Sequence, residues 1–453
     1  MATNISKRLS FKTKVGYGVG QLGSGLGYNL YYYYFIYFMT SLAGVNPAIA
    51  GTISLFAVIW DAVTDPMVGV FSDGQKIRTG TRRNLMMKAS IPLGITVFLL
   101  FTSFNFPNDS IKVIYYLIIN ILFWLSFTCC DIPHITIGQE LTDDFDEKSK
   151  IRGFSTAFLY VGELVVSGAT IIIVERSVSE AAGWSTVAII TAIVCAAAYF
   201  IAGLAVKGKE RIVTPKEASA NTNPLKNFRK CFKNKTYLIL LAIVIFANCI
   251  VGIQASCNIY VQKFVYNLDA VSIGVINMGK CFYMILCSLA IGALSGKIDK
   301  RSMMIGGFLA YGFGMSVVKF GPVMLPVYIF ALCFSALGNA TFWTLIYSVL
   351  ADVITIDNRE SGENTSGTQT SLLSMFIKFG TSFGMWAVGL GLAAYGLVET
   401  AVTQDPGVVA GIQNIYGVGG GVLGLIIAFL AYKYPLSRKE YNRRIAELDA
   451  AGK

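Results

Sequence analysis

WDAVTDP, residues 60–66, sets two acids inside an apolar run that is long enough to cross a membrane. Asp61 and Asp65 are four residues apart, so in a helix they share one face, with Cβ atoms roughly 5–6 Å apart. A charged side chain at the bilayer centre costs about 2.5–3.5 kcal/mol even on insertion scales, and like charges at this spacing repel each other. The pair therefore predicts a shared cation, a shared proton or a basic partner.

Further oxygen ligands lie near this pair in the sequence. Thr64 adds a hydroxyl, and Pro66, which has no N–H, leaves the carbonyl of Ala62 without its helical donor. A third acid, Asp131, stands in the apolar stretch TCCDIPH, residues 128–134. Hard cations bind carboxylate, hydroxyl and carbonyl oxygens, so Na⁺ is possible at the three acids if the two helices meet. The residues predicted for the cation site are Asp61, Thr64, Asp65, Thr128, Asp131 and Lys378.

The same acids could instead belong to a structural ion-pair network. Lys378, in the apolar stretch MFIKFG at 375–380, is a plausible countercharge for either interpretation. Glu163 and Lys280 are two further charges within apolar stretches, and each could line a pathway or pair elsewhere in the bundle.

The composition indicates a membrane protein. Of 453 residues, 54% are hydrophobic and only 14% are charged, which leaves too little polar surface for a soluble chain of this size. The polar segment 1–14 has no apolar stretch followed by a cleavage site, so no cleaved signal peptide is expected.

The net charge of +11 comes from Lys and Arg residues that lie in particular loops, and it does not indicate nucleic-acid binding. Lys and Arg gather in alternate loops, for example at 7–14, 76–83, 207–235 and 433–444. This positive-inside pattern predicts a multi-pass protein of the cytoplasmic (inner) membrane with both termini in the cytoplasm.

The hydrophobic pattern predicts an all-α membrane protein with about twelve helices in two six-helix halves. The first half, 1–206, is expected to contain helices at 15–41, 48–73, 86–104, 112–138, 152–175 and 184–206. A charged cytoplasmic linker, 207–236, is expected to follow. The second half, 237–453, is expected to contain helices at 237–266, 270–296, 302–320, 324–354, 367–397 and 408–434, and then a short cytoplasmic tail.

A glycine, an acid and a basic cluster follow the second predicted helix. This pattern resembles the cytoplasmic loop signature of the major facilitator superfamily, in which these groups latch the two halves. A topogenic loop with helix caps is the alternative. The residues predicted for gating at this loop are Gly69, Asp73, Arg78, Arg82 and Arg83.

Ordered motifs along nearly the whole chain resemble those of the glycoside–pentoside–hexuronide cation symporters, a family with the major facilitator fold. The motifs are GYGVG at 16–20, DAVTDP at 61–66, DIP at 131–133, FW at 342–343, AD at 351–352, KFG at 378–380 and YPL at 434–436.

The resemblance implies import of a glycoside or related sugar with Na⁺, Li⁺ or H⁺, by alternating access and without another cofactor. It implies that Asp61, Asp65, Thr128 and Asp131 bind the cation, with Lys378 close by, and that Asp131 and Trp343 contact the sugar. A carboxylate accepts paired hydroxyl bonds and an aromatic face packs on sugar C–H groups. The residues predicted for substrate contact are Gln21, Asn29, Asp131, His134, Arg152, Trp343 and Lys378.

Other functions are weaker alternatives. A lysolipid or another organic solute could use the same cation machinery, or the fold could serve as a sensor that does not transport. An enzyme is not expected, because no metal motif or nucleotide loop occurs and His134 is the only histidine. The nine cysteines lie mostly in apolar stretches and show no metal-ligand spacing. The expected partners are a small sugar, a monovalent cation and membrane lipid.

Overall fold

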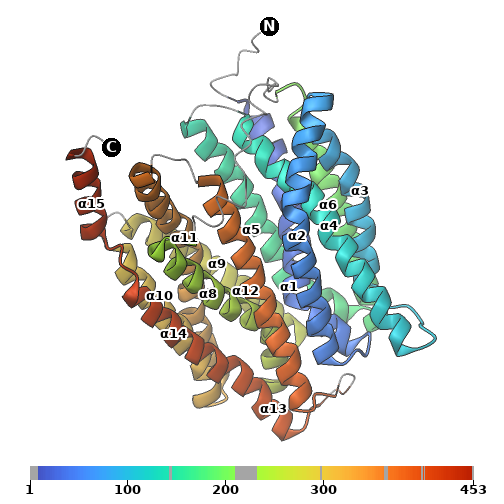
Figure 1. Ribbon diagram of the computed structural model, residues 1–453. Coiled ribbons are helices and arrows are strands. Elements are labelled where there is room, and N and C mark those ends of the chain that lie inside the picture. Colours follow the sequence, from blue (N-terminus) through green and yellow to red (C-terminus); the bar gives the residue numbers. More distant parts are fainter. Residues whose placement is uncertain are drawn as a thin grey trace. The chain divides into compact units, whose positions relative to one another are not determined.

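The computed structural model describes residues 9–141, 145–209, 232–295, 298–361, 366–398, 401 and 403–450. These residues form helices, and no strand occurs among them, which agrees with the predicted all-α fold (Figure 1). The first six helices are α1 (Phe11–Ser41), α2 (Pro47–Thr79), α3 (Arg83–Leu100), α4 (Asp109–Glu140), α5 (Phe145–Arg176) and α6 (Glu180–Ala205). The later helices are α8 (Lys235–Tyr260), η2 (Val261–Val265), α9 (Ala270–Leu294), α10 (Lys300–Phe320), α11 (Leu325–Ser361), α12 (Ser366–Ala394), α13 (Pro406–Gln413), η3 (Asn414–Gly419), α14 (Gly420–Lys433) and α15 (Arg438–Ala450).

The chain divides into two compact units. One contains Met1–Asn221 and Asp269–Met278, and the other contains Thr222–Leu268 and Gly279–Lys453. The predicted halves did not anticipate that the start of α9 belongs with the first unit. It does so because a Cβ on Gly274 would lie only 2.5 Å from the carbonyl oxygen of Gly168, so α5 and α9 approach each other backbone to backbone. Most of the predicted linker, residues 210–231, lies outside the described residues.

Helix α1 runs through the middle of the first unit. It packs against α5 and α6 and also touches α2 and α4. The fully buried hydroxyl of Tyr31 donates to Ser54 of α2 at 3.0 Å and accepts from Asn120 of α4 at 3.1 Å. Three helices are thus joined by hydrogen bonds within the apolar core, where water cannot replace a lost partner.

Glycines set the contact between α1 and α5. A Cβ on Gly25 would lie 2.4 Å from the carbonyl oxygen of Leu159, and one on Gly162 would lie 2.8 Å from the backbone nitrogen of Leu26. Small residues let helix backbones approach closely in membrane proteins, where packing replaces the hydrophobic effect as the main force between helices. The α1–α5 contact therefore depends on the absence of side chains at both positions.

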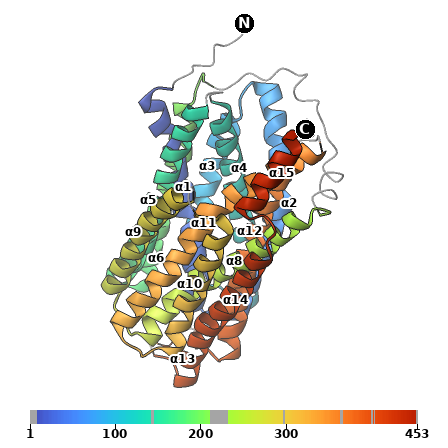
Figure 2. The same cartoon turned by 90° about the vertical axis from the view of Figure 1, so that its left-hand side faces the viewer.

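The second unit is built around α8 and α10. Helix α8 packs with α12 and α14, and α10 packs with α11 and α14; the α10–α14 pair runs side by side in both views (Figure 1, Figure 2). A buried hydrogen-bond network links α8, α10, α11 and η3. Tyr311 of α10 donates to Gln254 of α8 at 2.8 Å, Asn339 of α11 donates to Tyr311 at 3.2 Å, and Gln254 donates to Tyr416 of η3 at 3.4 Å.

Ten described segments are long and apolar enough to span a membrane. Helices α1 and α3 were also predicted as spans, but they are less apolar than these ten segments. The reason is composition: α1 carries six tyrosines between residues 28 and 37, and α3 begins with Arg83 and includes Lys88. The chain is a multi-pass membrane protein.

The helix ends differ from the predicted ones at several places, and α5, for example, begins at Phe145, seven residues before its predicted start. Helix α2 continues to Thr79, and α11 continues to Ser361, seven residues beyond its predicted end. The last predicted helix is broken into α13, η3 and α14, because η3 is a π-helical turn. The tail also forms a separate helix, α15, whose Asp449 accepts from Arg359 of α11 at 2.7 Å.

We expect Gly162→Ala to destabilise the protein, because the added Cβ would force α1 and α5 apart, and overpacking typically costs about 1–3 kcal/mol. Gly306→Ala in α10 is the matched control, since a Cβ there meets no atom within 4 Å. Alanine at such an open helical position typically stabilises by roughly 0.5–1 kcal/mol. The melting temperature in detergent should fall only for Gly162→Ala, and an equal melting temperature for both variants would contradict the close α1–α5 contact.

Candidate functional site

The two acids of α2 meet one hydroxyl of α4. Thr128 Oγ1 lies 2.6 Å from Asp61 Oδ1 and 3.0 Å from Asp65 Oδ1. Asp61 has an exposed fraction of 0% and Thr128 of 2%, so the contact lies inside the bundle, whereas Asp65 is half-buried. Three of the six residues predicted for the cation site therefore come together within the first unit.

The hydrogen-bond count at this contact is unusual. A threonine hydroxyl has one proton to donate and lone pairs that accept. It can donate fully to only one of two ionised carboxylates at a time, so a proton on one acid, a cation or a basic side chain beside the pair would lower the cost of this contact. The geometry suits a proton or a small hard cation, which favours carboxylate and hydroxyl oxygens.

Thr64, the fourth predicted cation ligand, is buried beside the pair. Its hydroxyl donates to the backbone carbonyl of Asp61 at 3.2 Å within α2. This bond turns the Thr64 oxygen toward its own helix.

Asp131, the fifth predicted ligand, is held by two other helices. Its Oδ1 accepts from Gln21 Nε2 of α1 at 3.3 Å and from the hydroxyl of Tyr199 of α6 at 3.0 Å. Asp131 and Thr128 are three residues apart in α4, so they are neighbours on one helix surface. One turn of α4 thus carries the hydroxyl that meets the acid pair and the carboxylate that meets Gln21.

His134 has defined roles at both ring nitrogens. Its Nε2 lies 2.9 Å from the backbone carbonyl oxygen of Tyr17, so Nε2 must donate. Its Nδ1 lies 3.2 Å from Gln21 Nε2 and can then accept from that amide. The Tyr17 ring stacks on the imidazole at 4.2 Å with an interplanar angle of 4°, and its hydroxyl donates to the His134 carbonyl at 3.0 Å. Gln21 therefore connects His134 to Asp131.

The remaining predicted substrate residues belong to both units. Asn29 of α1 is half-buried and donates to the carbonyl of Gly25 at 2.7 Å. Trp343 of α11 and Lys378 of α12 are half-buried in the second unit, where the Trp343 ring meets that of Phe342 at 5.1 Å. The side chain of Arg152 lies outside the described residues.

The predicted gating loop is mostly helical. Gly69, Asp73 and Arg78 lie on α2, because the helix runs on to Thr79, and only residues 80–82 separate it from α3. Arg82 precedes α3 and donates to Ser72 at 3.4 Å, and Arg83 is the first residue of α3. The side chains of Asp73 and Arg78 are outside the described set.

Two residues of the site were missed by the sequence-based prediction. Tyr17 lies in the GYGVG motif, but its place against His134 depends on how α1 crosses α4. Tyr199 stands in the apolar run AAAYFIAG at 196–203, which carries no functional signal. Within the described part of the chain, no three His, Cys, Asp or Glu residues gather in a cluster that could hold a metal ion.

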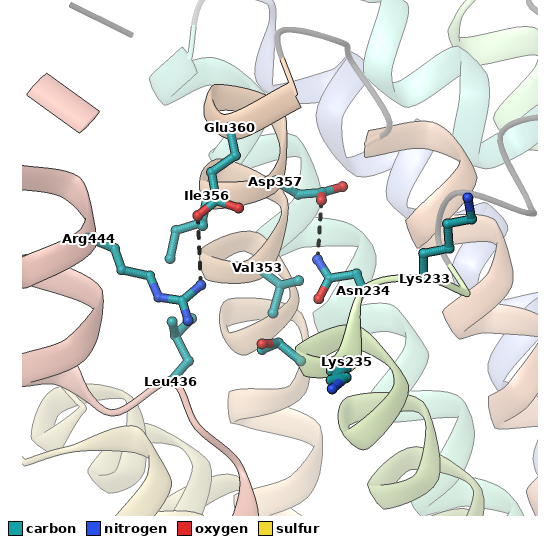
Figure 3. Close-up of a pocket in the computed structure, with 10 residues that line it drawn as sticks. Lys233, Asn234, Lys235, Val353, Ile356, Asp357, Glu360, Leu436 and Arg444 are labelled. Atoms are coloured by element: carbon teal, nitrogen blue, oxygen red, sulfur yellow. Dashed lines mark hydrogen bonds and ion pairs between the residues drawn. The ribbon is translucent and has the colours of Figure 1, made fainter. Parts of the chain in front are cut away.

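A separate polar cavity of about 390 Å³ lies in the second unit and contains none of the predicted site residues (Figure 3). Both of its acids have partners: Arg444 of α15 lies 3.7 Å from Glu360, and Asn234 donates to Asp357 at 3.2 Å (Figure 3). These pairs join α15 and the start of α8 to the end of α11. The cavity is lined by Lys233, Asn234, Lys235, Thr236, Val353, Ile356, Asp357, Glu360, Leu436 and Arg444.

Comparisons with known proteins extend over most of the chain. It is 27% identical to the isoprimeverose transporter of Lactiplantibacillus pentosus, over 93% of this chain and 88% of that protein. It is 24% identical to the glucuronide carrier protein homolog of Escherichia coli strain K12, over 98% and 97% of the two chains. The crystal structure of the nucleoside transporter NupG shares the fold, with a TM-score of 0.69 at 14% identity and coverage of 93% of this chain and 98% of that chain.

A family model described as MFS/sugar transport protein matches residues 16–438, which is nearly the whole chain. This match confirms the predicted major facilitator fold and the prediction of a transporter in place of an enzyme. The chain belongs to the MFS/sugar transport protein family.

Proposed function

We propose that this chain is a symporter that imports a glycoside or related sugar together with a monovalent cation by alternating access. The observation that carries the proposal is the single Thr128 hydroxyl between Asp61 and Asp65. Such a buried pair of acids is costly unless a positive species accompanies it. The proposal is supported by relatives named as an isoprimeverose transporter and a glucuronide carrier homolog.

The coupling ion is Na⁺, Li⁺ or H⁺, and the acid pair is its proposed binding site. All three ions would place positive charge between carboxylate oxygens, and the repulsion within the pair supports this role. Lys378, in the second unit, stays a proposed partner of the bound charge. The membrane is the cytoplasmic membrane, with both termini in the cytoplasm, as the distribution of Lys and Arg favours.

Coupling between cation and sugar is proposed to pass through one turn of α4. A cation at Asp61 and Asp65 orders Thr128, and Asp131 follows three residues later. Gln21 and Tyr199 already orient the Asp131 carboxylate, so it is prepared to accept hydroxyls from a sugar. Movement of α4 in response to the cation then changes the position of the Asp131 carboxylate relative to the sugar hydroxyls.

We expect Asp65→Asn to abolish cation-stimulated sugar accumulation, because it removes a charge and hardly changes the volume. Asp109→Asn is the matched control, since Asp109 is an exposed acid that pairs with Lys112 at 3.0 Å at the start of α4. Accumulation of a radiolabelled glycoside should be lost only in the Asp65 variant, at equal membrane abundance. Cation-stimulated accumulation at the wild-type level in Asp65→Asn would remove this residue from the site.

Thr128→Val should reduce the cation affinity about tenfold or more, because it replaces the shared hydroxyl with a methyl group of similar size and leaves two acids facing each other. Thr136→Val is the control on the same helix, since the Thr136 hydroxyl donates to its own helix, to Ile132 at 2.8 Å. The measurement is the cation concentration for half-maximal uptake. An equal shift in both variants would argue for a general effect on α4.

Linkage requires that the sugar raises cation affinity by the same factor by which the cation raises sugar affinity, typically roughly 5–150-fold. Asp131→Cys should weaken both ligands together, whereas Asp61→Cys should mainly weaken the cation and its effect on the sugar. Binding titrations of each ligand, at zero and saturating levels of the other, measure this. Two independent affinities in the wild-type protein would exclude coupling through Asp131.

A further inference from the structure

Helix α1 exposes a single stripe. Between residues 20 and 40 it is buried everywhere except at five positions, and at 100° per residue these lie within roughly 140° of its circumference. A face that meets lipid is normally apolar, yet four of the five side chains carry an amide or a phenol. The stripe consists of Gln21, Leu22, Tyr28, Asn29 and Tyr33. We call it the α1 stripe.

An acid of α5 joins the α1 stripe. Tyr33 donates to Glu163 Oε1 at 2.7 Å, and both side chains are half-buried. Val161 and Val165, two residues to either side of Glu163, are 50% and 44% exposed. Residues two apart in a helix point in nearly opposite directions, so Glu163 faces away from this apolar surface and toward α1.

The place of Glu163 along α1 follows from the glycine contact. Gly162 abuts Leu26, five residues beyond Gln21, so Glu163 is offset by about 7–8 Å along α1 from the residue that holds Asp131. A carboxylate has about four acceptor positions, so it can accept several hydrogen bonds at once, as Glu163 does from the Tyr33 hydroxyl. The tyrosine ring adds an apolar face beside the acid.

We propose that Glu163 and Tyr33 form a second sugar-contact position, and that the two acids along α1 select a neutral glycoside larger than one sugar ring. This inference rests on the proposed sugar import. Glu163 accepts hydroxyl hydrogen bonds from one part of the solute while Asp131 accepts them from another. A hexuronide or sulfonated sugar would bring a negative charge toward both carboxylates, and such like-charge contacts are an effective means of rejecting a wrong ligand.

The test is uptake of isoprimeverose, melibiose and cellobiose, compared with methyl β-D-glucuronide, by wild type, Glu163→Gln, Tyr33→Phe and the double variant. The wild type should transport a neutral disaccharide in preference to the glucuronide. Glu163→Gln should raise the KM for that disaccharide about tenfold or more and reduce the discrimination against the glucuronide. The cation concentration for half-maximal uptake should stay near the wild-type value, because Glu163 is outside the acid pair.

Two controls separate the contact from a folding effect. Glu175→Gln makes the same change on the same helix at an exposed position and should leave the KM unchanged. Glu163→Asp keeps the charge but shortens the side chain, so it should retain the charge discrimination with a raised KM. The effects of Glu163→Gln and Tyr33→Phe should be less than additive, since each removes the same hydrogen bond.

The outcomes are distinguishable. A wild-type KM in Glu163→Gln, or a wild type that prefers the glucuronide, overturns the second contact position and leaves the proposed function standing. A wild type that shows no cation-dependent uptake of any of the four sugars overturns both.

Discussion

Where α2 meets α4, the single hydroxyl of Thr128 lies within hydrogen-bond distance of the carboxylates of Asp61 and Asp65. The two acids share a face of α2, so a positive species beside them lowers the cost of placing both charges within the bilayer. This requirement connects packing to transport. In the proposed function, the transported ion offsets the repulsion between the two acids of α2, so ion binding and the α2–α4 contact are linked. Thr128 also lies one turn from Asp131, which brings the consequence of ion binding to the proposed sugar contacts.

Helix α1 supplies the fixed side of this arrangement. Its backbone touches α5 at Gly25 and Gly162, and its Tyr31 is bonded to both α2 and α4. In the proposed mechanism, a helix with this many contacts keeps Gln21 in place while α4 responds to the cation. Asp131 is then the meeting point of a rigid partner, Gln21, and a responsive neighbour, Thr128. The division of roles explains how a small movement of one turn can alter a ligand contact without loosening the whole unit.

The sequence predicted the helices and the acids well, because apolar length and a charge at membrane depth are local properties of the chain. It also placed Asp61, Asp65 and Thr128 in one site. The partners of Asp131 and Glu163 could not be predicted, since Tyr199 and Tyr33 lie 68 and 130 residues away and their reach depends on helix crossings. The α2 end was wrong for a different reason: glycines and charges at 69–78 are typical of a loop, yet the backbone stays helical to Thr79. The tyrosines of α1 lower its hydropathy although most of that helix is buried.

His134 is the only histidine of the chain, and each of its ring nitrogens has one partner type assigned by geometry: a carbonyl acceptor at Nε2 and an amide donor at Nδ1. A protein grown with ¹⁵N-labelled histidine would consequently contain a single labelled imidazole, one amide away from Asp131. Any ligand that draws Gln21 off the ring changes the electronic environment of Nδ1 while Nε2 stays bonded to Tyr17. The signal of Nδ1 should therefore change when a ligand moves Gln21, and the signal of Nε2 should serve as the internal reference.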